Sequence, residues 1–129
     1  MKLKVIRIYP SVWDLDVIVG GTQKELEEIS KKRYGLTYNF LQHNECTSID
    51  SAINSELKGR RGVVVTIKNT TDKLTIVHEI VHAIWHIADY IGYKITYDTQ
   101  EWQAILFEYI FDEITKKEGY QDYKTKSTK

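Results

Sequence analysis

Cysteine is almost absent from this sequence: Cys46 stands alone among 129 residues, which excludes an internal disulfide framework and suits a reducing compartment. An excess of charge of either sign is also missing, because 18 Lys and Arg residues balance 18 Asp and Glu residues. A chain without a basic surplus is poorly suited to neutralising phosphates. We therefore expect a cytoplasmic protein that does not bind nucleic acid.

Long hydrophobic runs are missing as well. The longest apolar-rich stretch, residues 74–91, is interrupted by three histidines, a glutamate and an aspartate, which a membrane span does not tolerate. The first seven residues alternate charged and apolar side chains, unlike the apolar segment of a secretory signal. We expect no membrane association. The length predicts one domain over residues 1–120, followed by a polar, frayed tail over residues 121–129.

The order of the expected strands and helices indicates an α+β domain. Strands are expected over residues 3–8, 16–19, 38–41 and 63–67. Residues 47–57 fit a helix or a strand, because Ile49, Ile53 and Leu57 recur at helical spacing in a context that favours a strand. We expect a small mixed or antiparallel sheet.

Three helices are expected to pack on this sheet. Thr22 and Glu25 have the spacing of a capping box, which predicts a helix over residues 23–33, and Gly35 is placed to end it in a left-handed conformation. Two longer helices are predicted over residues 72–91 and 99–117. The sheet therefore packs on an N-terminal helix, a buried central helix and a C-terminal helix.

The central helix carries the residues that predict chemistry. His78 and His82 lie one helical turn apart, so both imidazoles can reach one metal ion, and Glu79 can act on a water bound to it. Apolar residues cover over half of this helix, which predicts that it is largely buried. Its polar residues then need partners, and a metal is one such partner. The alternative is that backbone carbonyls satisfy both histidines.

A third metal ligand is expected on the last helix. That helix carries one acidic stripe, made of Glu101, Glu108 and Asp112. Glu101 has an alternative role as the capping-box partner of Asp98. Glu108 can instead pair with His86 or Lys94. His86 is excluded as a ligand because it lies about 12 Å along the helix axis from His78.

The pattern His78-Glu79-x-x-His82, followed by a glutamate on the next helix, resembles the zincin metallopeptidases with a glutamate as third ligand. Glu101-Trp102-Gln103-Ala104 is similar to the Glu-x-x-Ala of small zincin-like proteins of phages and mobile elements, including repressor-cleaving peptidases. This resemblance favours Glu101 over Glu108. The hairpin leading into residues 63–67 is similar to the edge strand on which such enzymes bind an extended substrate.

The resemblance implies a zinc-dependent metallopeptidase with a minimal zincin-like fold. His78, His82 and Glu101 would bind Zn²⁺, and Glu79 would act as the general base when a metal-bound water attacks a peptide bond of a peptide or protein substrate. The alternative is a zinc-binding, zincin-like module that regulates or assembles by binding, without hydrolysis. The sequence leaves the oligomeric state open.

Overall fold

The computed structural model describes residues 2–8, 14–36, 41–69 and 71–117. Its elements are β1 (Lys4–Ile8), β2 (Asp14–Val19), α1 (Gln23–Lys32), β3 (Glu45–Asp50), β4 (Arg61–Ile67), α2 (Lys73–Ile91), the 3-10 turn η1 (Tyr97–Thr99) and α3 (Gln100–Lys117). The predicted α+β class is confirmed. The strand expected over residues 38–41 and the tail over residues 121–129 fall mostly or wholly outside the described residues.

The four strands form one mixed sheet in the order β1-β2-β4-β3. β1 pairs antiparallel with β2, β3 pairs antiparallel with β4, and the two inner strands β2 and β4 are parallel. A parallel pair needs a crossover connection, and α1 lies within it. The predicted capping box starts α1, with Thr22 and Glu25 exchanging hydrogen bonds of 3.2 and 3.0 Å.

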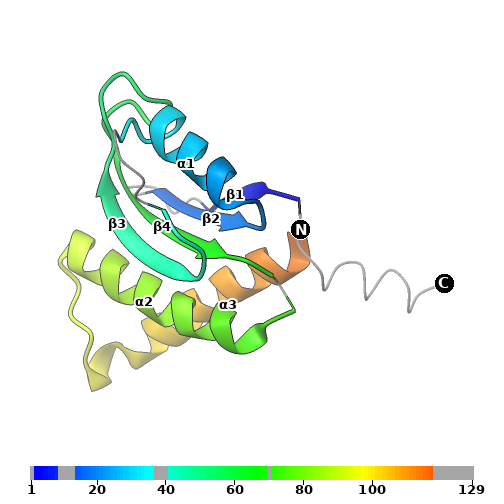
Figure 1. The fold of residues 1–129 in the computed structure, drawn as a ribbon. Helices are drawn as coiled ribbons and strands as arrows, with labels where there is room; N and C mark the ends of the chain where they lie inside the picture. Colours follow the sequence, from blue (N-terminus) through cyan, green and yellow to red (C-terminus); the bar gives the residue numbers. More distant parts are fainter. Residues whose placement is uncertain (1, 9–13, 37–40, 70, 118–129) are drawn as a thin grey trace.

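Helices cover both faces of the sheet. Figure 1 shows α1 on one side and α2 and α3 on the other. Because side chains alternate along a strand, Ile18 and Val64 pack toward α1, whereas Val17 and Val65 pack toward α2 and α3. The inner strands β2 and β4 are therefore buried on both faces, which explains the uninterrupted apolar runs of residues 17–19 and 63–65.

A buried ion pair fixes the end of α1 to strand β2. The Asp16 carboxylate, 2% exposed, accepts hydrogen bonds from the Arg33 guanidinium (2.8 and 3.2 Å) and from the Tyr34 hydroxyl (2.7 Å). Burial lowers the pKa of Arg33, but the hydrogen bonds and charge of Asp16 outweigh this, so the pKa of Arg33 is raised. The network therefore ties the C-terminal end of α1 to strand β2.

The expectation that the central helix is buried is wrong for one of its faces. Ile76, Ile80 and Ile87 pack against the sheet as predicted. A second set of apolar residues on α2 is exposed, namely Leu74, Val77, Val81, Trp85 and Ile91. The reason is that α2 and α3 form a single layer, with α2 against β3 and β4 and α3 against β1, and no described element covers the outer side of that layer (Figure 1).

The ambiguous segment, residues 47–57, divides into a strand and turns. β3 ends at Asp50, and the chain then turns so that the Gly59 N–H donates to the Ala52 carbonyl at 3.0 Å. Ile53, the middle residue of the apparent helical repeat, is exposed, while Ile49 and Leu57 are buried. Among the described helices, none combines the length and the apolar composition needed to cross a membrane.

Candidate metal centre

Helix α2 carries the candidate site and has well-defined ends. It starts at Asp72, whose carboxylate accepts hydrogen bonds from the backbone N–H (3.1 Å) and the hydroxyl (2.6 Å) of Thr75. These hydrogen bonds lower the pKa of Asp72, which keeps a negative charge at the positive end of the helix dipole. The helix ends at Gly92, which has φ = 74° and no neighbour that an added Cβ would meet.

Two imidazoles converge on the outer side of this helix. The Nε2 atoms of His78 and His82 are 3.2 Å apart, and the two rings are inclined at 69°. Two nitrogens bound to one tetrahedral zinc ion, at about 2.0–2.1 Å each, are separated by about 3.3–3.4 Å. The pair therefore fits a shared metal ion, although the same spacing also suits a hydrogen bond between one neutral ring and the other. Both side chains are exposed, so an ion can approach them from solvent.

Glu79 completes the group. Among the residues that the structure describes, one set of potential ligands is close enough to hold a metal ion, namely His78, Glu79 and His82, whose ligand atoms lie within 4.8 Å of one another. Glu79 is 5% exposed, in contrast to the two histidines. Two imidazoles and one carboxylate form a donor set that binds divalent transition metals in proteins, zinc and iron among them. The structure thus contains a possible metal-binding site.

The carboxylate of Glu79 is also influenced by strand β3. Burial raises the pKa of Glu79, the charges of His78 and His82 lower it, and the charge of Glu45 raises it, with a net shift upward. On the same strand, burial followed by the charge of Glu79 raises the pKa of Cys46 to about 12. Glu79 therefore belongs to the side of α2 that packs against β3, while the imidazoles turn toward solvent.

The strand beside the site is the edge of the sheet. The hairpin expected from the sequence exists, but its inner strand is β4, and β3, its other strand, lies at one of the two edges of the sheet, where β4 is its neighbour among the described strands. The edge therefore lies at Glu45–Asp50 and not at residues 63–67. The sequence did not indicate Glu45 or Cys46 as neighbours of Glu79, because they are brought together by the pairing of β3 with β4 and the packing of α2.

The predicted third ligand lies on another helix. Glu101 is exposed in the first turn of α3 and is not a member of the group of three. α2 continues nine residues beyond His82, about 13.5 Å, before the chain returns in the opposite direction along α3 (Figure 1). Glu101 as a ligand stays a prediction. Glu108 is exposed further along α3, and His86 is half-buried and also outside the group.

One alternative role of Glu101 is not supported by the local structure. Asp98, its expected capping partner, lies inside the turn η1 and not at an N-cap position. The turn is closed instead by Thr99, whose hydroxyl accepts a hydrogen bond from the Thr96 N–H at 2.9 Å. The carboxylate of Glu101 is therefore not required for a capping box with Asp98.

Comparisons of the chain with protein-family models, with curated proteins and with solved structures found no match. The geometry of His78, Glu79 and His82, and the chemistry that these side chains support, are what indicate a function.

Proposed function

We propose that this protein is a zinc-dependent metallopeptidase acting on a peptide or protein substrate. The observation that carries the proposal is the convergence of the Nε2 atoms of His78 and His82, 3.2 Å apart, beside the buried carboxylate of Glu79. His78, His82 and a carboxylate from α3 hold the metal, and Glu101 is our choice for that carboxylate. A bound Zn²⁺ supplies the positive charge that activates a water and polarises the scissile carbonyl.

Glu79 is the general base in this proposal. Its carboxylate accepts the proton of the attacking water and delivers it to the nitrogen of the leaving amine, so it is regenerated in each cycle. Its place in the sequence, next to the ligand His78, puts it within reach of a water at the metal. Its burial restricts the side chain to few conformations, which favours a fixed geometry for proton transfer.

The free edge of β3 provides a place for the substrate backbone. An edge strand has N–H and C=O groups that no neighbouring strand uses, and an extended peptide can pair with them. β3 packs against α2 on the side of Glu79, so a peptide added to this edge would run close to the general base. This arrangement supports a polypeptide substrate over a small molecule.

Metal content is the first test. Elemental analysis of protein purified without chelator or affinity tag should give about one zinc per chain, as expected for a site with three protein ligands. His78→Ala should lose the zinc, while His86→Ala, the same change on the same helix outside the group, should keep it. Loss in Glu101→Ala and retention in Glu108→Ala would support our third ligand, and the reverse would assign Glu108. A wild-type protein that takes up no zinc would contradict the proposal.

Hydrolysis is tested separately from metal binding. Glu79→Gln keeps the size of the side chain but cannot accept a proton, so it should retain zinc and lose peptide hydrolysis by at least about a hundredfold. If both the wild type and Glu79→Gln bind zinc and neither hydrolyses any peptide in a diverse library, the protein is a zinc-binding module. The exposed apolar face of α2 is the observation that favours this second function, because such faces mark interaction surfaces.

A further inference from the structure

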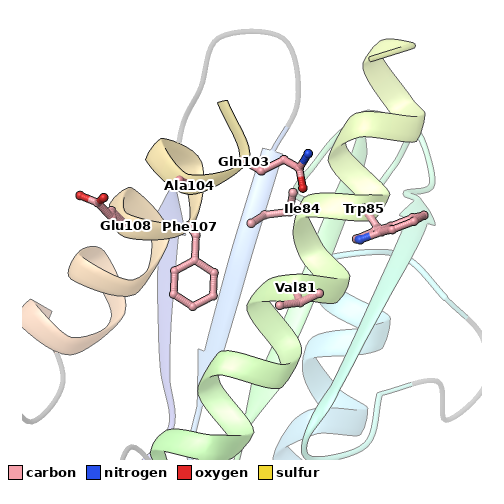
Figure 2. A pocket seen from close by; sticks show the side chains of 7 residues that line it. All are labelled: Val81, Ile84, Trp85, Gln103, Ala104, Phe107 and Glu108. Atoms are coloured by element: carbon pink, nitrogen blue, oxygen red, sulfur yellow. The ribbon is translucent and has the colours of Figure 1, made fainter. Parts of the chain in front are cut away.

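Two hollows lie side by side on the outer surface of the α2/α3 layer and share one residue, Trp85. The first, of about 440 Å³, lies between the helices and is lined by Val81 and Trp85 of α2 and by Ala104 and Phe107 of α3 (Figure 2). The second, of about 470 Å³, extends from Trp85 to the segment that follows α2, including Tyr93. We call the two hollows together the Trp85 trough.

The Trp85 trough is mostly apolar and open to solvent. Trp85 is 58% exposed and Val81 is 45% exposed, although both stand on a helix that also supplies part of the core. A further exposed apolar residue, Val77, adjoins Val81 one helical turn away on α2. Contiguous exposed apolar surface, with an aromatic residue at its centre, is typical of surfaces that bind a partner.

Acidic residues outnumber basic ones along the trough: Asp89 and Glu108 line it, together with one basic residue, Lys94. Asp112, one helical turn after Glu108, is exposed on the same stripe of α3. A negative rim attracts Lys and Arg and repels nucleic acids and anionic lipids.

The trough borders the candidate metal centre. Residues three or four apart on a helix are neighbours on its surface, so Val81 adjoins His78 and Trp85 adjoins His82. A polypeptide bound in the trough would therefore lie within one helical turn of the two imidazoles. The opposite side of the centre is formed by the edge strand β3, which leaves the trough as a separate contact region.

We propose that the Trp85 trough binds the protein substrate through a segment that combines apolar side chains with Lys or Arg residues. The apolar side chains fill the hollows on either side of Trp85, and the basic residues pair with the acidic rim. Identifying this segment as part of the substrate rests on the proposed function. The binding of such a segment does not, because none of the apolar residues that line the trough is a metal ligand.

The test uses the full chain and two synthetic amphipathic peptides, one of Leu and Lys and one with Glu in place of every Lys. Binding is measured by calorimetry and by tryptophan fluorescence, with EDTA present so that no metal is needed. We expect the Leu/Lys peptide to bind at least about tenfold more tightly than the Leu/Glu peptide, a difference of about 1.4 kcal/mol. Affinity should fall as salt is added and in Asp112→Lys.

Two neighbouring substitutions on α3 form a matched pair. Ala104 lines the trough and Ile105, the next residue, does not, and both are exposed, so neither Ala104→Phe nor Ile105→Phe should impair folding. We expect Ala104→Phe to fill the first hollow and to lower the affinity for the Leu/Lys peptide at least about tenfold, and Ile105→Phe to change it less than about twofold. Equal effects of the two changes, or equal binding of the two peptides, would overturn the proposal.

The remaining outcomes separate this proposal from the proposed function. If the protein takes up zinc but does not bind the Leu/Lys peptide, the proposal of a docking site in the trough is wrong and the proposed peptidase stands. If it binds the peptide but takes up no zinc, the proposed peptidase is wrong and the docking site stands. If sedimentation shows a dimer that the Leu/Lys peptide dissociates and that Ala104→Phe prevents, the occupant of the trough is a second copy of the chain, and our assignment to a substrate is wrong.

Discussion

Burial should decide how much an ion pair contributes to the stability of this protein. The chain offers two Asp–Arg pairs of nearly equal length, Asp16–Arg33 at 2.8 Å and Asp50–Arg61 at 2.7 Å. The Asp16 side chain is 2% exposed and also binds the Tyr34 hydroxyl, whereas the Asp50 side chain is 73% exposed. The same substitution, Asp→Asn, can therefore be made at a buried carboxylate, which both Arg33 and Tyr34 contact, and at an exposed one.

The two substitutions should lower the free energy of unfolding by amounts that differ several-fold. Asp16→Asn leaves the charge of Arg33, whose side chain is 13% exposed, without its counter-ion, and breaking a buried pair in this way costs about 3–5 kcal/mol. Asp50→Asn removes a pair that water and salt already screen, which costs less than about 1 kcal/mol. Since small domains are stable by about 5–15 kcal/mol, the first loss is a large fraction of the total.

Chemical denaturation followed by circular dichroism measures both losses in the same buffer. Tyr34→Phe removes a single hydrogen bond to Asp16 and should cost about 1–3 kcal/mol, which keeps the network testable if Asp16→Asn does not fold. Losses below about 1 kcal/mol for both Asp16→Asn and Tyr34→Phe would refute the argument from burial. A loss for Asp50→Asn as large as that for Asp16→Asn would refute it as well.

Two further predictions concern conformation and titration. Gly35 and Gly92 both have a left-handed φ, of 70° and 74°. A Cβ added at Gly35 would lie 2.5 Å from the Cβ of Ala52, whereas a Cβ added at Gly92 would meet nothing within 4 Å. Gly92→Ala should therefore cost only the conformational term of about 1–2 kcal/mol, and Gly35→Ala distinctly more, in the same unfolding assay; equal costs would contradict the crowding at Gly35. The pKa of Cys46 is raised from 9.0 to about 12 in the folded protein, so the unfolded chain loses the thiol proton first as pH rises. The free energy of unfolding should then fall above about pH 9, by up to about 1.4 kcal/mol per pH unit. In Cys46→Ala the free energy of unfolding should fall less steeply over the same pH range, because the thiol is gone.

Local signals in the sequence predicted the helices and several of their ends. Thr22 with Glu25 predicted the start of α1, and a glycine follows α2 where a left-handed residue is needed. Such signals depend on neighbours within a few residues, so they can be read without knowing the fold. The apolar runs of β2 and β4 were recognisable for the same reason, because strands buried on both faces leave few polar positions.

The features that were missed depend on contacts between distant segments. Ile49, Ile53 and Leu57 have helical spacing, but pairing with β4 converts the first part of that segment into a strand. The composition of α2 indicated how much apolar surface it has, and not how much of that surface its neighbours cover. In the candidate site, the spacing of His78 and His82 was sufficient to predict their convergence, whereas the approach of Glu45 to Glu79 required the sheet order.

The position of β3 at the edge of the sheet also has a consequence for local unfolding. Among the described strands, β4 is held by hydrogen bonds on both sides and β3 on one side, so β3 can open while the rest of the domain stays folded. Helix α2 rests on both strands. The candidate metal centre therefore spans a rigid and a labile part of the molecule: opening of β3 would admit water to Glu79 while His78 and His82 keep their helical spacing. Access to the carboxylate is in this way separable from the integrity of the imidazole pair.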